Sequence, residues 1–594
     1  MSLTQTTSFL CPENTLSFLH KAKVSCLPVK SCYDYDKTKF SLFSNGKSRY
    51  PRTSNISKLS VLYNGYPYFP SLHHPLESEL LPAASDHDGV DRGIGILEFF
   101  QGKNIFITGA TGLVGKALIE KLLRSTSVGK IYLLIKAEDK EAAVDRLKKE
   151  IVDSELFKCV REKHGNIYNY QELVKEKLIP VVGNICDPNL GMDLNSSRAI
   201  MKDVDVIIES AASTTLNDRY DFLLDTNVNA PQRLMRFAKT CKNLKLFVHI
   251  STAYVNGRKE GLILEKPLIM GENGRKDIND DDEMSLCSSP RLDLADEISL
   301  AMKSTSQHDQ DYDVTKNLKR LGLERANIFG WYNAYHLTKA MGEMVLNEIK
   351  EDIPLLIIRP TVIESSYKEP VPGWIQGNRM FDPVIISYGK GQLPAYLADP
   401  QVHMDIIPVD MVVNSTIAAI AKHASNSYKA ESNVYHVASG VVNPLRFCDF
   451  FEILHEYFNS TPLFNIKKDI RKIKCFSNMN ELSKYTREAI LLSNEMGDAI
   501  DDDEIEEKMV GRVKSRAKAK VAYAEQLCKM YEFIGFIQGR FDTSNTQKLL
   551  KEMSQEEQLE FEVDATKIDW RNYFLEIHIP GLRKYVLNDK TMSV

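Results

Sequence analysis

The chain lacks the cysteine patterns and long apolar runs that mark secreted, zinc-binding and membrane-spanning proteins. Its ten cysteines are scattered from Cys11 to Cys528, and no two of them form a C-x-x-C pair. This spacing shows neither a disulfide framework nor a zinc motif, and it is typical of free thiols in a reducing compartment. Because no run reaches the roughly 18 apolar residues that a membrane-spanning helix needs, we expect no transmembrane segment.

A surplus of positive charge is also missing. The formal net charge is −5 over 594 residues, whereas nucleic-acid-binding domains are usually strongly basic. The hydrophobic content of 43% and the charged content of 26% are those of an ordinary globular protein. We therefore expect more than one domain in a chain of this length, and no nucleic-acid partner.

The first 62 residues differ from the rest in charge. They contain 9 lysines and arginines and 11 serines, but only 3 acidic residues. A basic, serine-rich leader without a compact apolar segment resembles an organelle transit peptide, and its excess of lysine over arginine favours the plastid. A tail without an address is the alternative. Residues 63–94, rich in proline, tyrosine, histidine and serine, are predicted to be a linker.

Six continuous apolar runs follow, separated by amphipathic segments. Runs without polar alternation are typical of strands that are covered on both faces. Alternating β and α units predict an α/β fold with a Rossmann-type, doubly wound parallel sheet and right-handed crossovers. The predicted strands are residues 104–108, 131–136, 178–183, 204–210, 244–251 and 354–360.

The sheet domain is expected to span residues 95–465 and to carry one acidic insertion. Residues 270–318 are predicted to form this insertion, as a solvated and partly disordered surface loop. Residues 466–518 are charged and predict an exposed connector. A small, mostly helical C-terminal domain is expected at 519–594.

The turn after the first predicted strand carries three glycines, in the sequence TGATGLVG. Gly109 suits a tight turn, Gly112 lets backbone N–H groups approach a pyrophosphate, and Gly115 allows the next helix to pack closely. The phosphates would lie at the helix N-terminus, where free N–H groups favour negative charge. A strand precedes the turn and a helix follows it, so the context predicts a dinucleotide site that includes Thr111 and Leu113. A purely structural turn is the alternative.

The end of the second predicted strand bears on the choice of dinucleotide. NAD enzymes usually place an acid here for the ribose hydroxyls, whereas this chain has Lys136 in the sequence LLIKAED. A cation at this position suits the 2′-phosphate of NADPH, although lysine is a point charge rather than a bidentate fork. Glu138 and Asp139 weaken the signal, and a solvated lysine is the alternative. Lys136 therefore favours NADPH.

Tyr335 and Lys339 lie four residues apart in the helical segment YHLTKAMGEMV, so both side chains emerge on one face. A phenol has an unperturbed pKa of about 10, too high for easy proton exchange at neutral pH. A neighbouring ammonium favours the phenolate and lowers that pKa, which would make Tyr335 a usable general acid or base. Alone, Y-x-x-x-K indicates only a solvated helix face, and its place downstream of the glycine turn gives it weight.

Two hydroxyls follow the fifth predicted strand, in the sequence HISTAYVNG. Ser251 and Thr252 would emerge at the carboxyl edge of the sheet, where ligands bind in such folds. Either hydroxyl could hydrogen-bond a substrate carbonyl and orient it for hydride attack. Strand-end capping is the alternative for each. Together with the glycine turn, Tyr335 and Lys339, the two hydroxyls predict an oxidoreductase site.

The three elements together resemble the extended short-chain dehydrogenase/reductase superfamily, and more closely the alcohol-forming fatty acyl-CoA reductases of the plant male-sterility type. The resemblance covers roughly residues 95–594 and includes the C-terminal string IDWRNYFLEIHIPGLRKY. Further strings that fall in the family's order are KIYLLIKA, PVVGNICD, NDRYDFLLDTN, HISTAYVNG, LGLERA, YHLTKAMGE, IIRPTVIES, EPVPGWIQGNR and PVDMVVN.

The resemblance implies roles for individual residues. Tyr335 would be the proton donor, with Lys339 as its partner at the nicotinamide ribose. Thr252, or alternatively Ser251, would take the hydroxyl position, and Asn227 corresponds to the superfamily's helix asparagine near the cofactor. The sequence departs from the family pattern at Leu113, where an aromatic residue is usual, and at Ser213, where asparagine is common. No departure removes a catalytic group.

The implied reaction is the reduction of a long-chain acyl thioester to a primary alcohol with two NADPH, through a bound aldehyde. The acyl donor would be acyl-CoA or, given a plastid address, an acyl-carrier protein. In plants the male-sterility type supplies fatty alcohols for the pollen wall. The reaction needs no metal and no cysteine nucleophile.

Other functions fit parts of the pattern. A sugar-nucleotide epimerase or a hydroxysteroid dehydrogenase would share the sheet, but the C-terminal region and the string PGWIQGN count against both. A non-catalytic NADP-binding regulator would typically lack the pair of Tyr335 and Lys339. Tyr531, Phe533 and Phe536 could contact a membrane peripherally, but such aromatics more often lie in a core.

Overall fold

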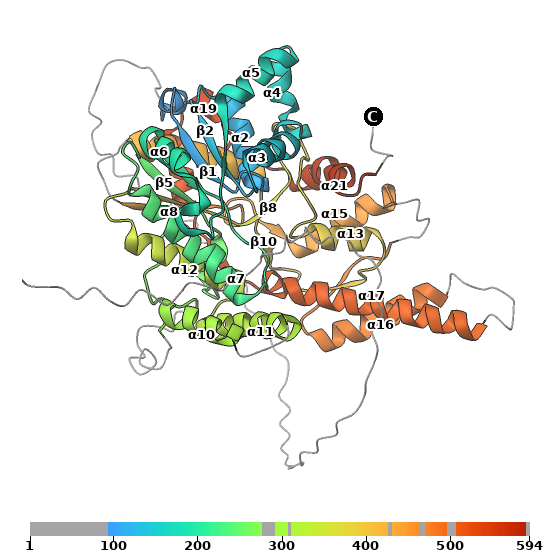
Figure 1. Ribbon diagram of the computed structural model, residues 1–594. Helices are drawn as coiled ribbons and strands as arrows, with labels where there is room; N and C mark the ends of the chain where they lie inside the picture. Colours follow the sequence, from blue (N-terminus) through green and yellow to red (C-terminus); the bar gives the residue numbers. More distant parts are fainter. Residues whose placement is uncertain are drawn as a thin grey trace, which may run out of the picture. The chain divides into compact units, whose positions relative to one another are not determined.

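The computed structural model describes residues 93–275, 291–306, 311–425, 431–463, 470–495 and 506–589 (Figure 1). The predicted transit peptide and all but the last two residues of the predicted linker lie outside this part of the chain. Residues 87–594 form one compact unit, within which every feature below is found.

A seven-stranded parallel sheet forms the centre of this unit, in the order β12-β7-β5-β4-β1-β2-β3 (Figure 1). All six predicted strands are confirmed, and the fold is the expected doubly wound α/β type. The seventh strand, β12, was missed because its sequence SNVYHV begins with polar residues rather than an apolar run. The strands are β1 Ile105–Thr108, β2 Ile131–Ile135, β3 Leu178–Val182, β4 Val206–Glu209, β5 Leu246–Ile250, β7 Leu355–Pro360 and β12 Ser432–Val437.

Successive residues of a strand supply the cores on the two faces of the sheet. Ile105 and Ile107 of β1 pack into one core, whereas Phe106 between them packs into the other. The first core is covered by α1 (Ile96–Phe100), α2 (Leu113–Ser125) and α14 (Val409–Ser425). The second is covered by α6 (Leu194–Asp203), α8 (Ala230–Ala238) and α12 (Ala334–Ile349). Burial on both faces explains why the strands read as continuous apolar runs.

The other elements surround these layers. The helices are α3 Lys140–Leu147, α4 Lys158–Lys163, α5 Ile167–Lys177, α7 Tyr220–Leu224, α10 Leu294–Ser306, α11 Asp311–Phe329, α13 Asp382–Gly389, α15 Phe447–Ser460, α16 Met479–Glu495, α17 Glu506–Gly535, α18 Ser544–Glu552, α19 Gln555–Glu560, α20 Trp570–Asn572 and α21 Ile579–Tyr585. The short strands are β6 Gly261–Ile263, β8 Val362–Glu364, β9 Ala395–Leu397, β10 His403–Met404, β11 Ile406–Pro408, β13 Leu445–Arg446, β14 Lys474–Phe476 and β15 Gly539–Phe541.

The acidic insertion is not a loop throughout, which corrects the expectation for residues 270–318. Residues 276–290 lie outside the described chain, but α10 and α11 follow and pack on α7 and α12. Glu297 of α10 is buried, accepts a hydrogen bond from Tyr220 at 2.8 Å and pairs with Arg325. The high content of acidic residues predicted a solvated loop, but one of these residues, Glu297, is buried with its partners in the folded protein.

The C-terminal region shares the main core instead of forming a body of its own. The expected boundary at residue 519 falls inside α17, and β15 pairs in parallel with β6, about 280 residues earlier in the chain. The carboxylate of Glu557 accepts hydrogen bonds of 2.8 Å from the backbone N–H groups of Ile94, Gly95 and Ile96, at the start of α1. The C-terminal helices therefore complete the compact unit that contains the sheet.

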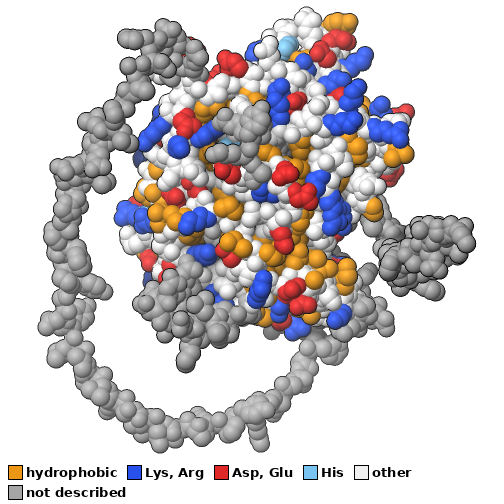
Figure 2. Space-filling view, turned by 90° about the vertical axis from the view of Figure 1, so that its left-hand side faces the viewer, with side chains coloured by type: hydrophobic (Ala, Val, Ile, Leu, Met, Phe, Trp, Pro, Cys, Tyr) orange, Lys and Arg blue, Asp and Glu red, His pale blue; other side chains and the backbone are white. Residues whose placement is uncertain are grey.

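Three aromatic residues at the end of α17 and directly after it lie against this core. Tyr531 is buried, and Phe533 and Phe536 are partly buried against the main core. Among the described residues, no helix combines the length and the apolar character that a membrane crossing needs. One face of the molecule shows basic and acidic side chains interspersed with hydrophobic ones (Figure 2).

Candidate active site

The glycine turn between β1 and α2 has the geometry that its sequence predicts. Gly109 adopts φ +73°, and a side chain there would come within 2.7 Å of the backbone of Ser210. A side chain at Gly115 would come within 2.3 Å of the carbonyl oxygen of Gly109, so α2 packs directly on the turn. Gly112 is the N-cap of α2, and no described side chain caps that end of the helix. The first N–H groups of α2 are therefore available to an anion.

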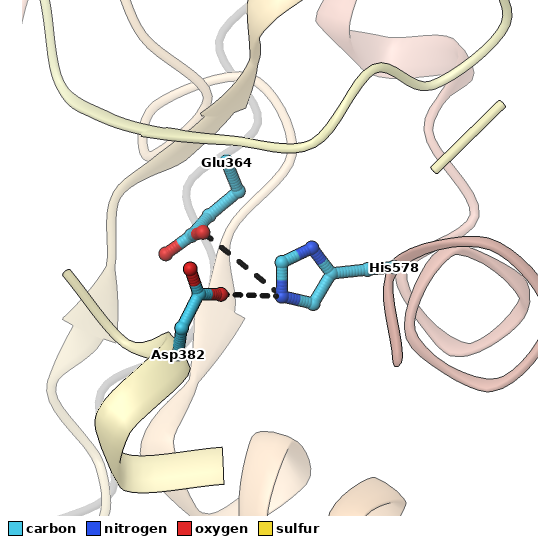
Figure 3. A group of neighbouring side chains, drawn as sticks. All are labelled: Glu364, Asp382 and His578. Atoms are coloured by element: carbon cyan, nitrogen blue, oxygen red, sulfur yellow. Dashed lines mark ion pairs between the residues drawn. The ribbon is translucent and has the colours of Figure 1, made fainter. Parts of the chain in front are cut away.

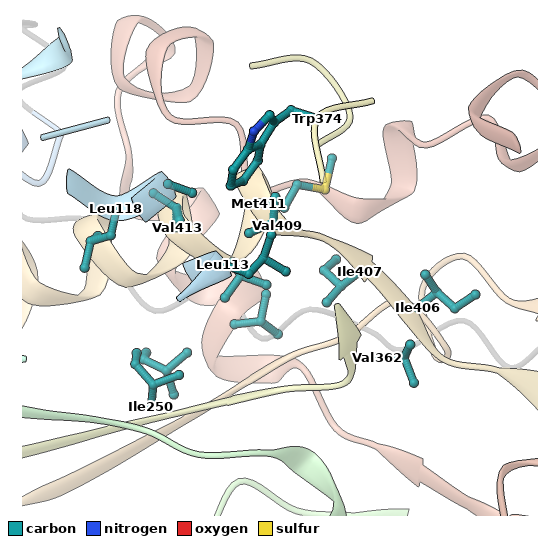
Figure 4. Packing of buried hydrophobic residues seen from close by; sticks show 14 of the residues in the cluster. Leu113, Leu118, Ile250, Val362, Trp374, Ile406, Ile407, Val409, Met411 and Val413 are labelled. Atoms are coloured by element: carbon teal, nitrogen blue, oxygen red, sulfur yellow. The ribbon is translucent and has the colours of Figure 1, made fainter. Parts of the chain in front are cut away.

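Two residues predicted to bind the cofactor also make side-chain contacts within the protein. Leu113 packs in the main core beside residues of α14 and Ile250 (Figure 4), because the helix turns this position inward. Asn227, in the π-helical turn η4 (Asp225–Asn229), is fully buried. Its amide accepts from Ser213 N at 3.0 Å and donates to Ser213 O and Thr338 Oγ1, both at 3.1 Å. Asn227 thus links the loop after β4 to α12, which is a positioning role.

The end of β2 carries two cations near one another. Lys136 is exposed directly after the strand, as the sequence suggested. Its carbonyl oxygen accepts a hydrogen bond of 2.6 Å from Arg146 of α3, whose guanidinium also pairs with Glu150. Arg146 was missed because it lies ten residues downstream, on the next helix. A guanidinium provides the bidentate geometry that Lys136 lacks.

Helix α12 presents Tyr335 and Lys339 at the carboxyl edge of the sheet. Lys339 is buried, and its Nζ donates to the carbonyl oxygen of Ile250 at 2.9 Å and lies 3.3 Å from Nε2 of His249. Nδ1 of His249 contacts the carboxylate of Glu209. Glu209 and His249 are register partners at the ends of β4 and β5. Glu209, His249 and Lys339 form a continuous buried group, and the half-buried Tyr335 lies one helical turn before the lysine.

The expected lowering of the Tyr335 pKa by Lys339 is not what the structure shows. Burial and, more weakly, the charge of Glu209 raise the pKa of Tyr335, so the phenol keeps its proton at neutral pH. Burial lowers the pKa of Lys339, while Glu209 and Glu343 oppose that shift. Burial and the adjacent ammonium lower the pKa of His249, which makes it neutral and able to accept from Lys339. The arrangement suits Tyr335 as a proton donor.

Both predicted hydroxyls lie at the end of β5 and are buried. Thr252 Oγ1 caps the short 3₁₀ turn that follows, accepting from Tyr254 N at 3.4 Å and donating to Pro360 O at 3.5 Å. Both contacts are longer than ordinary hydrogen bonds, so a substrate oxygen can compete for this hydroxyl. Ser251 Oγ has no hydrogen-bond partner in the described part of the chain.

The sequence reasoning missed Glu209, His249 and Glu343. The first two stand in strands that are otherwise apolar, and a charged residue in a doubly covered strand is the signal that could have identified them. Glu343 lies two turns after Tyr335 on α12 and is fully buried with Arg359 of β7. The ring of Phe533 lies 5.1 Å from His336 and 5.3 Å from Tyr332. The C-terminal region therefore contributes a side chain beside the Tyr335 helix.

Comparison with known proteins agrees with this architecture. Two family models described as male sterility protein match residues 107–416 and 508–589. Fatty acyl-CoA reductase 2, chloroplastic, of Arabidopsis thaliana is 46% identical over 509 residues, which cover 84% of this chain and 81% of the relative. The alcohol-forming fatty acyl-CoA reductase of Simmondsia chinensis is 39% identical over 508 residues, covering 83% of this chain and 99% of the relative.

A solved structure shares the fold at low sequence identity. The terminal R domain from the myxalamid PKS-NRPS biosynthetic pathway superposes with a TM-score of 0.50 at 14% identity, covering 82% of this chain and 91% of that one. The family models together span both the sheet and the C-terminal region, and the resemblance inferred from the motifs is confirmed. The chain therefore belongs to the male sterility protein family of fatty acyl-CoA reductases.

Proposed function

We propose that the protein reduces long-chain fatty acyl thioesters to primary alcohols with NADPH, through an aldehyde that stays bound. The observation that carries the proposal is the buried group Glu209–His249–Lys339 beside the protonated Tyr335, at the sheet edge that the glycine turn also faces. Its relatives are named fatty acyl-CoA reductases, one of them alcohol-forming. A sugar-nucleotide epimerase or a hydroxysteroid dehydrogenase has no such support among these relatives.

The residues divide the chemistry between them. A bound nicotinamide supplies hydride to the acyl carbonyl. The Thr252 hydroxyl and Tyr335 Oη hydrogen-bond the carbonyl oxygen and stabilise the negative charge that develops on it. Tyr335 donates its proton to that oxygen, and Lys339, held by Ile250 O and His249, keeps a positive charge near the phenol. The C–S bond then breaks as the hydroxyl proton returns to Tyr335 Oη, and the thiolate leaves and takes a proton from solvent. A second NADPH, exchanged for the oxidised cofactor, would supply hydride to the aldehyde, and the same groups would act on its carbonyl oxygen.

The glycine turn and the β2 end fit the dinucleotide. The uncapped start of α2 suits the pyrophosphate, and Lys136 with Arg146 suits the 2′-phosphate. The activity is tested by incubating the purified chain with palmitoyl-CoA or palmitoyl-carrier protein and NADPH, and by analysing the lipids by gas chromatography. Hexadecanol formation supports the proposal. Accumulation of aldehyde alone limits it to one reduction, and absence of both products contradicts it.

We expect Lys136→Ala to weaken the binding of NADPH and to leave the binding of NADH unchanged. An exposed charge contributes up to about 1 kcal/mol, so KM for NADPH should rise by up to about fivefold. Steady-state kinetics with the two cofactors measure the ratio. Lys140→Ala, an exposed lysine of α3, serves as the matched control. An equal rise of KM for both cofactors would place Lys136 away from the 2′-phosphate.

The alkaline limb of the pH profile should move to lower pH in Glu209→Gln. The Glu209 charge raises the pKa values of both Lys339 and Tyr335, so removing it allows each to lose its proton at a lower pH. Activity requires both groups to be protonated, and kcat/KM should therefore begin to fall earlier as pH rises. Glu348→Gln is the control, because Glu348 is exposed on α12, the helix that carries Tyr335 and Lys339. An unmoved limb, or one moved to higher pH, would show that Glu209 does not act on this pair.

A plastid location is proposed on two grounds. Residues 1–62 have the composition of a transit peptide, and the Arabidopsis relative is named chloroplastic. That location would make acyl-carrier protein available as an acyl donor. The pollen wall is one proposed destination of the fatty alcohols. A fluorescent protein fused behind residues 1–70 should enter plastids, and cytosolic fluorescence would contradict the address.

A further inference from the structure

A second cluster of ionisable side chains lies outside the proposed catalytic group. Glu364 ends β8, Asp382 begins α13, and His578 ends the π-helical turn η8 (Tyr573–His578) of the C-terminal region. All three side chains are 0% exposed, and they point toward one another (Figure 3). One potential ligand atom from each lies within 4.8 Å of the others.

The facing atoms of the cluster have no hydrogen bonds. His578 Nε2 lies 3.3 Å from Asp382 Oδ1 and 3.9 Å from Glu364 Oε2 (Figure 3). None of these three atoms meets hydrogen-bond geometry with any residue that the structure describes. The remaining carboxylate oxygens are bonded, because Phe381 N donates to Glu364 Oε1 at 3.2 Å and Arg379 N donates to Asp382 Oδ2 at 2.8 Å. Three fully buried polar atoms thus converge at ion-pair distances without hydrogen-bond geometry, which is uncommon in a folded protein.

The other side of the imidazole is held in place. His578 Nδ1 lies 3.0 Å from Ser365 Oγ, and the Tyr573 hydroxyl donates to the Ser365 carbonyl at 2.7 Å. A metal-binding histidine nearly always donates its second ring N–H to an oxygen in this way, which fixes the tautomer. In the tautomer that carries its proton on Nδ1, directed to Ser365, the Nε2 lone pair faces both carboxylates. Two ionised carboxylates and this lone pair in one buried space are stabilised by a positive charge between them.

The two carboxyls and the imidazole share one buried space, in which one potential ligand atom of each lies within 4.8 Å of the others. Two buried carboxylates without a counter-charge would destabilise the folded protein. The candidates for the charge are a proton on Glu364 or a metal cation held by all three residues.

We propose that Glu364, Asp382 and His578 bind a divalent cation, with zinc as the best-matched ion. Tetrahedral zinc with bonds of about 2.0–2.2 Å separates its ligand atoms by about 3.3–3.6 Å, close to the distances from His578 Nε2. One imidazole and two carboxylates suit zinc better than calcium or magnesium, which prefer oxygen ligands alone. The ion would join β8 and α13 to the C-terminal turn η8, locking that region onto the sheet.

The test uses the full chain purified without chelator. Metal content is measured by inductively coupled plasma mass spectrometry, and thermal unfolding is followed before EDTA treatment, after it, and after ZnSO4 is added back. We expect about one zinc per chain, a lower Tm after EDTA, and recovery with zinc. Glu364→Gln and His578→Gln should each bind zinc at least about tenfold more weakly. Ser365→Ala leaves all three ligands in place, so it remains informative if the other variants misfold. It should weaken zinc binding about tenfold.

Two results would overturn the site. A Tm that responds to neither EDTA nor zinc, with Glu364→Gln as stable as the unaltered chain, would show that a proton on Glu364 fills the space. Zinc content equal in all variants would show adventitious surface binding. His164→Gln, a histidine outside the cluster, is the control and should keep both zinc affinity and the zinc-dependent Tm.

Discussion

Tyr335→Phe should reduce alcohol formation by about 10²–10⁴-fold while the protein still folds and binds NADPH. The substitution removes only the hydroxyl, and the structure gives that hydroxyl the raised pKa of a proton donor. Without it, the oxygen of the reduced carbonyl must take its proton from water and loses a hydrogen bond in the transition state. The loss should appear in kcat, because the cofactor contacts at the glycine turn are unchanged.

The measurement compares three proteins in the palmitoyl-CoA assay. Tyr332→Phe is the matched control, since Tyr332 lies just before α12 and contacts Phe533 and Arg258 through its ring. NADPH fluorescence titration and thermal unfolding check binding and folding in each variant. Activity of Tyr335→Phe within about twofold of the unaltered enzyme would remove Tyr335 from the chemistry and leave the proposed mechanism without a proton donor.

Glu343→Ala should lower the free energy of unfolding by about 3–5 kcal/mol. Glu343 and Arg359 are both 0% exposed, and the Arg359 Nε lies 3.0 and 3.1 Å from the two carboxylate oxygens. Arg359 also contacts His436, whose pKa is lowered to about 3 by burial and by the guanidinium, so the imidazole cannot compensate. Removing the carboxylate would leave a buried guanidinium unpaired.

The same change should reduce activity, because Glu343 anchors the helix that carries Tyr335 and Lys339. Urea denaturation of the single variants and of Glu343→Met/Arg359→Met measures the coupling between the two residues. The double variant should recover much of the lost stability, since well-packed apolar pairs often replace buried ion pairs without penalty. Glu348→Ala, exposed on α12, should stay within about 0.5 kcal/mol. A loss below about 1 kcal/mol for Glu343→Ala would mean that Arg359 finds another partner.

Local pattern determined much of this protein. The six apolar runs became strands because burial on both faces demands apolar residues at every position, and this requirement is visible without any distant contact. The glycines of the turn followed from backbone conformation, which is equally local. Tyr335 and Lys339 share a helix face because four residues make about one turn. These features fixed the fold class and the reaction class.

The tertiary structure decided what these residues contact. Lys339 meets His249 and Ile250 about 90 residues earlier in the chain, and no local pattern encodes a contact at that separation. Burial and the charge of Glu209, which lies on β4, reversed the expected direction of the Tyr335 pKa shift. The side chain of Leu113 packs in the core, a contact that its place beside the glycine turn did not reveal. His578 reached Glu364 and Asp382 only because the C-terminal region folds back onto the sheet, bringing together groups whose charges have meaning only at close range.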